Sequence, residues 1–170
     1  MKYVEIVTPK LLMRPATLFE WEMKEMIGWL NNPLVVRFSE QRHRHHTMQT
    51  QMDYIMSFRG DDLLLSIIHE RTMIGTISAR IDGANKVANV GIMIGDHAKW
   101  GFGFGFDAWK GLCDHLLENG TRKIEAGCMV CNVSMMSICS RYEMMEEGRQ
   151  EDHFLYYEVP MDLVHWGKIK

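Results

Sequence analysis

Glycine alternates with phenylalanine in the stretch KWGFGFGFDAWKG, residues 99–111, which places glycine at positions 101, 103 and 105. An apolar run typical of a β-strand precedes the stretch, and a pattern typical of an amphipathic helix follows it. The glycines are therefore expected in a strand-to-helix turn. Glycine permits positive φ angles and close backbone approach to a ligand, and the free N–H groups at a helix start favour an anion. The segment predicts a phosphate-binding loop, with a glycine-weakened strand as the alternative.

Neither of the two common nucleotide-binding fingerprints occurs in this loop. A Walker loop needs a Gly-Lys-Ser/Thr triplet, which GFGFGFDAW does not contain. The dinucleotide fingerprint GxGxxG would need glycine where this chain has Phe106. The GxGxG pattern by itself therefore does not define which phosphate is bound.

A second candidate site is the basic stretch VVRFSEQRHRHHT, residues 35–47. Its arginines and histidines outnumber a single acid, and these side chains can bind the phosphate or carboxylate of a substrate. A solvated basic loop is the alternative. Adjacent histidines diverge and no cysteine or carboxylate stands at ligand spacing, so no metal site is expected. The charged residues are Arg37, Glu40, Arg42, His43, Arg44, His45 and His46.

The four cysteines are expected to be plain buried thiols. Cys128 and Cys131 form one CxxC pair inside an apolar run, and a structural zinc site would need a second pair. Cys113 and Cys139 stand alone in helical patterns. No secretion signal is evident, and a chain of 170 residues does not depend on a disulfide framework.

Composition indicates one ordinary globular domain, residues 1–170, with 46% hydrophobic and 24% charged residues. A formal net charge of −3 and a pI near 6.2 argue against a nucleic-acid partner, which would usually require a positive excess. No apolar run approaches the ~20 residues that a membrane helix needs. A cytoplasmic location without a membrane partner is expected.

Hydrophobic periodicity predicts a mixed α/β domain with a largely antiparallel first half and a βαβ unit in the middle. The expected strands are residues 4–15, 62–70, 72–82, 86–96, 122–130 and 153–161. The expected helices are residues 18–33, 46–58, 107–120 and 132–145. Thr47 is expected to cap the second helix, and Asn119 with Gly120 to end the third.

The segments NVGIMIGDHAKWGFGFGFDAW and CNVSMMSICSRYEMMEEGR, within residues 89–149, together resemble the GNAT superfamily of acyl-coenzyme A-dependent N-acetyltransferases. They are most similar to the branch of ribosomal-protein N-terminal acetyltransferases and their small-molecule-modifying relatives. LLMRPAT and WLNNPLVVRFSE extend the resemblance over essentially the whole chain. It implies an α/β fold whose central, mostly antiparallel sheet is flanked by helices and contains a splayed central strand pair.

The same resemblance implies acetyl-CoA as the cofactor, without a metal. Backbone N–H groups from Trp100 to Gly105 would bind the pyrophosphate, although the superfamily usually has Arg or Gln at position 100. The pantetheine arm would lie along the strand of residues 92–94, where one N–H would polarise the thioester oxygen. The implied cofactor-binding residues are Ile92, Met93, Ile94, Trp100, Gly101, Phe102, Gly103, Phe104, Gly105 and Asn132.

Two positions depart from the family pattern for acid–base catalysis. Asn89 stands where many relatives carry a glutamate that could act as base, and Cys139 stands at the position of a tyrosine general acid. A thiol could protonate the leaving thiolate, but a cysteine on an apolar helix face is also typical of a core. Tyr142 and a water molecule are alternative acids. Glu143-Met144 replaces the usual GF at the end of that helix.

In this branch the segment between the first two helices lines the acceptor pocket. The implied substrate-binding residues are Arg37, Ser39, Glu40, Arg42, His43 and Arg44, with Ser39, Glu40 or a histidine near the amine. The basic charge disfavours a polycation and favours a nucleotide-linked amino sugar. A protein N-terminus is the second hypothesis, and a catalytically silent coenzyme A-binding module is the third. The methionine-rich helices leave open a homodimer.

Overall fold

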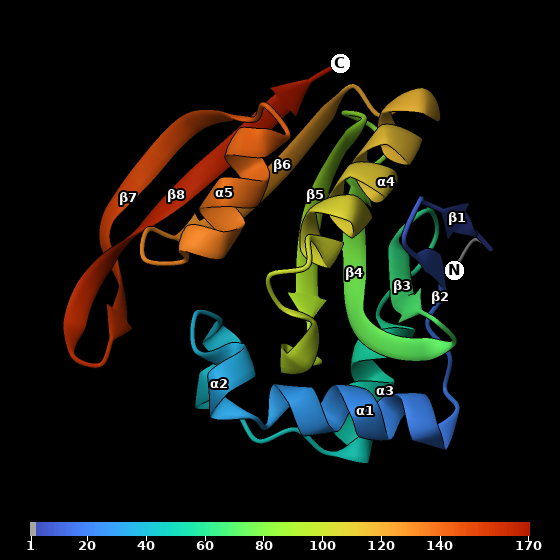
Figure 1. Ribbon diagram of the computed structural model, residues 1–170. Helices are drawn as coiled ribbons and strands as arrows, with labels where there is room; N and C mark the ends of the chain where they lie inside the picture. The colour runs from blue at the N-terminus through green and yellow to red at the C-terminus, as the bar shows by residue number, and fades with distance from the viewer. Residues whose placement is uncertain (1–2) are drawn as a thin grey trace.

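A single eight-stranded sheet forms the centre of the computed structural model, which describes residues 3–170 (Figure 1). The strand order is β1-β2-β3-β4-β5-β6-β8-β7, and every neighbouring pair is antiparallel except β5–β6. The strands are β1 (Ile6–Val7), β2 (Leu12–Pro15), β3 (Leu63–His69), β4 (Thr72–Asp82), β5 (Val87–Ile94), β6 (Lys123–Met129), β7 (Met145–Tyr156) and β8 (Val159–Ile169). The expected mixed α/β fold with a mostly antiparallel sheet is confirmed.

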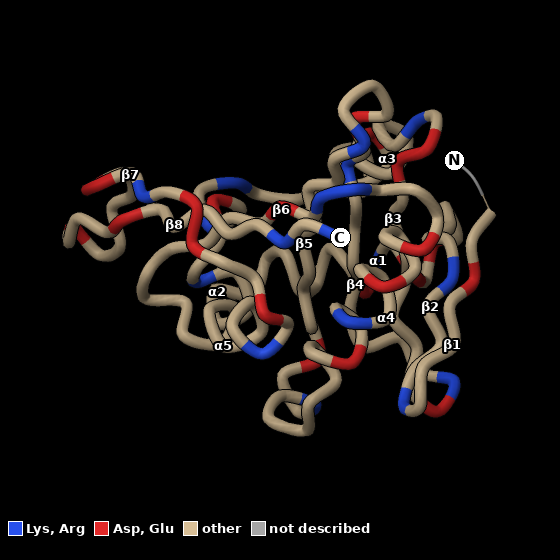
Figure 2. The backbone as a smooth tube through the Cα atoms, turned by 90° about the horizontal axis from the view of Figure 1, so that it is seen from above, with Lys and Arg blue, Asp and Glu red and all other residues tan. Residues whose placement is uncertain are grey.

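Five α-helices and two 3-10 helices accompany the sheet in residues 3–170. They are α1 (Glu20–Leu30), α2 (Pro33–Val36), η1 (Glu40–His43), α3 (Met48–Met56), η2 (His97–Lys99), α4 (Phe104–Glu118) and α5 (Val133–Arg141). Seen along the sheet, α4 and α5 lie on one side of it and α3 on the other (Figure 2).

Strands β5 and β6 diverge after a short parallel contact. Only Val87–Asn89 pairs with Lys123–Glu125. Beyond that point β5 continues to Ile94 against β4, while β6 continues to Met129 against β8. The facing backbone edges of the two strands therefore lack a strand partner over their second halves, which confirms the splayed central pair.

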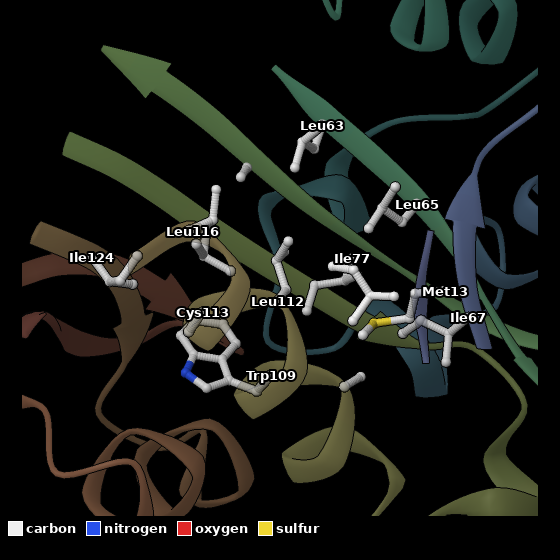
Figure 3. Close-up of a cluster of buried hydrophobic side chains, with 14 of the residues drawn as sticks. Met13, Leu63, Leu65, Ile67, Ile77, Trp109, Leu112, Cys113, Leu116 and Ile124 are labelled. Atoms are coloured by element: carbon white, nitrogen blue, oxygen red, sulfur yellow. The ribbon is translucent and has the colours of Figure 1, made fainter. Parts of the chain in front are cut away.

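The main core lies between α4 and the sheet (Figure 3). Trp109, Leu112 and Cys113 of α4 have no exposed surface, because the apolar stripe of this helix faces the strands. A second cluster joins α1 and α3 to the sheet, with Met23 and Met26 buried inside it. These two methionines therefore pack internally.

Local signals set several boundaries as the sequence predicts. The Thr47 hydroxyl accepts a hydrogen bond from the Thr50 N–H and caps α3. Helix α4 ends at Asn119, and Gly120 follows with φ of 102°. Glu70 and Arg71 both have positive φ angles in the tight turn between β3 and β4, as two-residue hairpins require.

Two strand predictions are wrong. Residues 4–15 form a hairpin, because the Thr8 hydroxyl accepts a hydrogen bond from the Leu11 N–H where the chain reverses between β1 and β2. Residues 153–161 contain the turn between β7 and β8, where Tyr157 and Glu158 have positive φ angles. Most β7 side chains are exposed, so this strand has no buried face to give a period-two pattern.

Candidate active site

The glycine stretch forms a strand-to-helix turn between β5 and α4, so its interpretation as a strand is wrong. Gly101 and Gly103 adopt left-handed backbone conformations with φ of 83° and 81°, which β-carbon sterics disfavour for other residues. Gly103 is the N-cap of α4 and supplies no side-chain cap. Gly105 lies in the first turn of the helix, where an added Cβ would be 3.3 Å from Ile138 Cδ1 of α5.

Unbonded backbone amides collect at this turn. Within residues 3–170, the N–H groups of Gly101, Phe102 and Gly103 have no hydrogen-bond acceptor. The first N–H groups of α4 have no intrahelical acceptor either, and the helix dipole adds positive potential there. Lys10 Nζ donates to the Phe102 carbonyl at 3.0 Å and adds a full positive charge. The turn can therefore hold phosphate groups.

Lys10 is a residue of this site that the sequence does not indicate. It belongs to the turn between β1 and β2 and lies 92 positions before Phe102. Its ammonium group also lies 5.8 Å from the Phe104 ring centroid. No local pattern links a lysine in that hairpin to the glycine turn, so only the tertiary structure brings the two together.

Trp100 has a different role from the glycines that follow it. Its backbone N–H donates to the His97 carbonyl at 3.2 Å, and its indole Nε1 donates to the Ile94 carbonyl at 2.7 Å. Neither group is available to a phosphate. Trp100 instead ties the turn to the end of β5 and so fixes the position of the glycines.

The other predicted cofactor residues flank the opening between β5 and β6. Ile92, Met93 and Ile94 lie beyond the last β5–β6 pair. Asn132 caps α5 by accepting a hydrogen bond from the Met135 N–H at 3.1 Å. The Asn132 side-chain N–H₂ has no acceptor within the described chain, so it can donate to a ligand.

The two side chains predicted as general acids lie in the core. Cys139 has no exposed surface, and burial raises the pKa of its thiol to about 12. Tyr142 is buried, and its hydroxyl donates to Asp114 Oδ1 of α4 at 2.8 Å. Burial, followed by this hydrogen bond, raises the pKa of Tyr142. These contacts favour structural roles for both residues, as the core alternative for Cys139 anticipates.

A Cys139→Ala substitution tests this assignment. Because the thiol is buried and holds its proton strongly, we expect kcat and its pH profile to be unchanged while the protein becomes less stable. Steady-state kinetics and thermal unfolding of the same preparation measure both quantities. A large loss of kcat with unchanged acetyl-CoA affinity would instead support the proton-donor role.

The basic segment contacts the turn between β7 and β8. Arg42 donates to the Ser39 carbonyl at 3.0 Å and to the Leu155 carbonyl at 2.9 Å, and it pairs with Glu40 at 2.9 Å. The Ser39 hydroxyl accepts from the Gln41 N–H and caps η1. Arg42 and Glu40 thus form an ion pair with each other, and Arg42 also holds the turn between β7 and β8 against η1. His43 and Arg44 are exposed.

Arg37 links the basic segment to the glycine turn. Its guanidinium lies 4.8 Å from the Phe38 ring and 5.5 Å from the Trp100 ring. Phe38 in turn packs on Tyr156 of β7, with ring centroids 5.4 Å apart. A guanidinium flanked by aromatic rings therefore lies between the predicted acceptor segment and the predicted cofactor loop.

Other kinds of site are not evident in residues 3–170. No group of three or more His, Cys, Asp or Glu residues is arranged to hold a metal ion there. The four cysteines are free thiols. In the described chain, no helix combines the length and the apolar character needed to cross a membrane.

Comparison with known proteins identifies the fold. No protein-family model and no curated protein matches the sequence. A solved structure of RimL, a ribosomal L7/L12 alpha-N-protein acetyltransferase in complex with coenzyme A, is 18% identical over 98% of both chains, with a TM-score of 0.85. The microcin C7 self-immunity acetyltransferase MccE, in complex with acetyl-CoA and AMP, is 19% identical over 95% of this chain and 93% of its own, with a TM-score of 0.80.

A GNAT-family acetyltransferase from Bacillus anthracis is 15% identical over 98% of both chains, with a TM-score of 0.80. The chain therefore adopts the fold of the GNAT acetyltransferases. This result confirms the fold that the sequence motifs imply.

Proposed function

We propose that this chain is an acetyl-CoA-dependent N-acetyltransferase that transfers an acetyl group to a primary amine by direct attack. The observation that carries the proposal is the group of unbonded amides at the uncapped start of α4, beside the unpaired edge of β5. The amides fit a pyrophosphate, and an extended pantetheine arm can hydrogen-bond to a free strand edge. The coenzyme A and acetyl-CoA complexes of RimL and MccE support this assignment.

Acetyl-CoA, when bound, supplies an acetyl group activated as a thioester. The amides of residues 101–103 and the Lys10 ammonium bind and orient its phosphates. N–H groups on the free edge of β5 donate toward the thioester oxygen and stabilise the charge that develops there. The Asn132 amide can hold the arm from the β6 side. The chain thus positions the reacting carbonyl inside the opening of the sheet.

The acceptor that we propose is a nucleotide-linked amino sugar or a similar anionic small molecule. Arg37 offers a guanidinium for a phosphate, and Phe38 with Tyr156 offers aromatic surface for a base. The exposed Arg44 adds positive charge on the same segment, and the exposed His43 adds a polar ring. The AMP bound to MccE supports a nucleotide in this fold.

A protein N-terminus is the second candidate acceptor, because RimL is a protein acetyltransferase with a similar fold. The basic segment would then bind an acidic peptide. A coenzyme A-binding module without catalysis is the third candidate, since Asn89 and Cys139 replace two residues that relatives use as base and acid.

Release of free thiol from acetyl-CoA distinguishes these candidates. The acceptor panel contains nucleotide-linked amino sugars, aminoglycosides, polyamines and short peptides with free N-termini. Turnover confined to the nucleotide sugars supports the proposal, and a preference for peptides supports a protein acceptor. Tight acetyl-CoA binding without turnover of any amine would support the silent module.

Arg37→Ala tests the contact with the acceptor. Losing a charged hydrogen bond of about 1.5–3 kcal/mol should raise the KM of an anionic acceptor by about tenfold or more, because only the acceptor phosphate loses its partner. The KM of acetyl-CoA should change much less. Arg59→Ala, an exposed arginine outside the site, is the matched control. An equal rise in both KM values would assign Arg37 to the cofactor loop instead.

A further inference from the structure

Two glycines face each other across the opening between β5 and β6. Side chains alternate along a strand, and Val90 of β5 and Ala126 of β6 lie in the core beneath α4. Gly91 and Gly127, the next residues along each strand, therefore face the opposite side of the sheet. Each stands two positions beyond the last β5–β6 pair, Asn89 with Glu125, so the two are level with one another.

These glycines leave a gap on the exposed face of the sheet, which we call the glycine window (Gly91 and Gly127). The Leu163 side chain borders it, with Cδ1 3.3 Å from the position of a Cβ on Gly127. Both residues are exposed. An added Cβ at Gly91 would meet only Ser78 Oγ within 4 Å, at 3.5 Å. No helix of the described chain covers this side of β6 and β8, whereas α4 and α5 cover the other side (Figure 2). Neither glycine has a positive φ angle, so turn geometry does not explain them.

His165 stands at the rim of the glycine window. It pairs with Gly127 across β6 and β8, and its Nδ1 lies 3.9 Å from the position of a Cβ on Gly127. The ring is partly exposed, and no hydrogen bond or ion pair within residues 3–170 engages it. A neutral imidazole with a free nitrogen can accept a proton.

The charged neighbours on this face are already paired with each other. Lys123 of β6 contacts Glu125 at 2.9 Å and Glu147 of β7 at 2.7 Å. Glu147 lies over Gly167, the next residue of β8 on the same side as His165. The ammonium of Lys123 therefore forms ion pairs with both carboxylates. Among these residues beside the window, His165 is the titratable side chain that has no ion pair or hydrogen bond within the described chain.

We propose that the acceptor amine reaches the thioester through the glycine window and that His165 takes the proton from its ammonium form. This inference rests on the proposed function. The phosphate loop and Asn132 lie at the starts of α4 and α5, so the cofactor fills the opening from the helix-covered side and the amine must approach from the other. A methyl or larger group at either glycine would stand in that path.

The proton and electron balance of the step is simple. The acceptor ammonium gives one proton to His165, and the neutral nitrogen attacks the thioester carbon. The new C–N bond forms as the C–S bond breaks, and the departing thiolate takes the second proton of the nitrogen. His165 then returns its proton to solvent, so the products are an amide, free coenzyme A and one proton.

His165→Gln tests the proton transfer, because glutamine keeps a polar side chain that cannot titrate. General base catalysis contributes about 10²–10⁴-fold, so we expect kcat to fall on the order of 10²-fold near neutral pH. The loss of kcat should shrink as pH rises through the pKa of the acceptor amine (about 8 for an α-amino group), because solvent then deprotonates the acceptor. His153→Gln, an exposed histidine on β7, is the matched control.

If His165→Gln lowered kcat by the same factor at every pH, that result would overturn the proton transfer and leave only a structural role for His165. Gly127→Val tests the window independently. Valine suits a strand position, and its Cβ would lie 3.3 Å from Leu163 Cδ1, the far end of a flexible side chain that can shift. We expect the acceptor kcat/KM to fall more than tenfold, while calorimetry shows unchanged acetyl-CoA affinity. Unimpaired turnover in Gly127→Val would overturn the window. Failure of the wild-type chain to bind acetyl-CoA would overturn the proposed function itself, and the inference with it.

Discussion

Gly103→Asp is expected to abolish acetyl-CoA binding while the protein stays folded. The substitution places a carboxylate at the N-cap of α4, among the amides that would hold the pyrophosphate. Its Cβ would lie 3.4 Å from Lys10 Nζ, so the new carboxylate would also pair with the nearby lysine. Hydrogen bonds to charged groups contribute about 1.5–3 kcal/mol each, and losing two of them weakens binding by about 100-fold or more.

Gly103→Asn separates charge from shape, because asparagine has the size of aspartate without its charge. Both residues tolerate the left-handed conformation better than most, which matters at a φ of 81°. Isothermal titration with acetyl-CoA should show a much smaller loss for the asparagine variant than for the aspartate variant. Equal affinities of wild type and Gly103→Asp would refute the phosphate loop.

The strand-to-helix glycine turn could be predicted from sequence because all of its signals are local. A strand, glycines at the turn and an amphipathic helix follow one another within about thirty residues, and each has a pattern of its own. The capping of α3 by Thr47 and the turn after His69 are local in the same way. Such features depend on backbone conformations that only a few residue types support.

Features that depend on contacts between distant segments could not be predicted. Lys10 meets the glycine turn across 92 positions, and Arg42 meets Leu155 across 113. The glycine window depends on the register of one short parallel contact, and His165 joins it only through the pairing of β6 with β8. No periodicity in the sequence encodes these registers.

The same long-range contacts explain how the molecule could join its two binding regions. The Trp100 indole donates a hydrogen bond to the end of β5, and the Arg37 guanidinium of the basic segment lies 5.5 Å from its ring centroid. Arg42 fixes that segment to the turn between β7 and β8. The proposed cofactor loop and the proposed acceptor segment are thus connected through one aromatic–cation contact, Arg37 with Trp100, rather than through a continuous strand.

A buried ion pair holds α1 against the sheet. The Glu22 side chain of α1 has no exposed surface, and it pairs with Arg14 of β2. Its Oε2 atom accepts hydrogen bonds from the Thr17 N–H at 2.8 Å and from the Ser66 hydroxyl at 3.2 Å. Arg14 is the only cation paired with this carboxylate within residues 3–170. Arg14 therefore supplies the counter-charge for the buried Glu22 carboxylate.

Arg14→Met is expected to destabilise the protein strongly, because methionine keeps much of the volume but leaves the Glu22 carboxylate without its counter-charge. Breaking a buried ion pair costs about 3–5 kcal/mol, and we expect the lower end of that range because Arg14 is 27% exposed. Urea unfolding followed by circular dichroism gives the free energy of unfolding. The double variant Arg14→Met/Glu22→Gln should recover much of the loss, since no buried charge remains. If Arg14→Met alone unfolds at the wild-type urea concentration, then solvent or the neighbouring hydrogen bonds stabilise Glu22, and the ion pair does not determine how α1 is held.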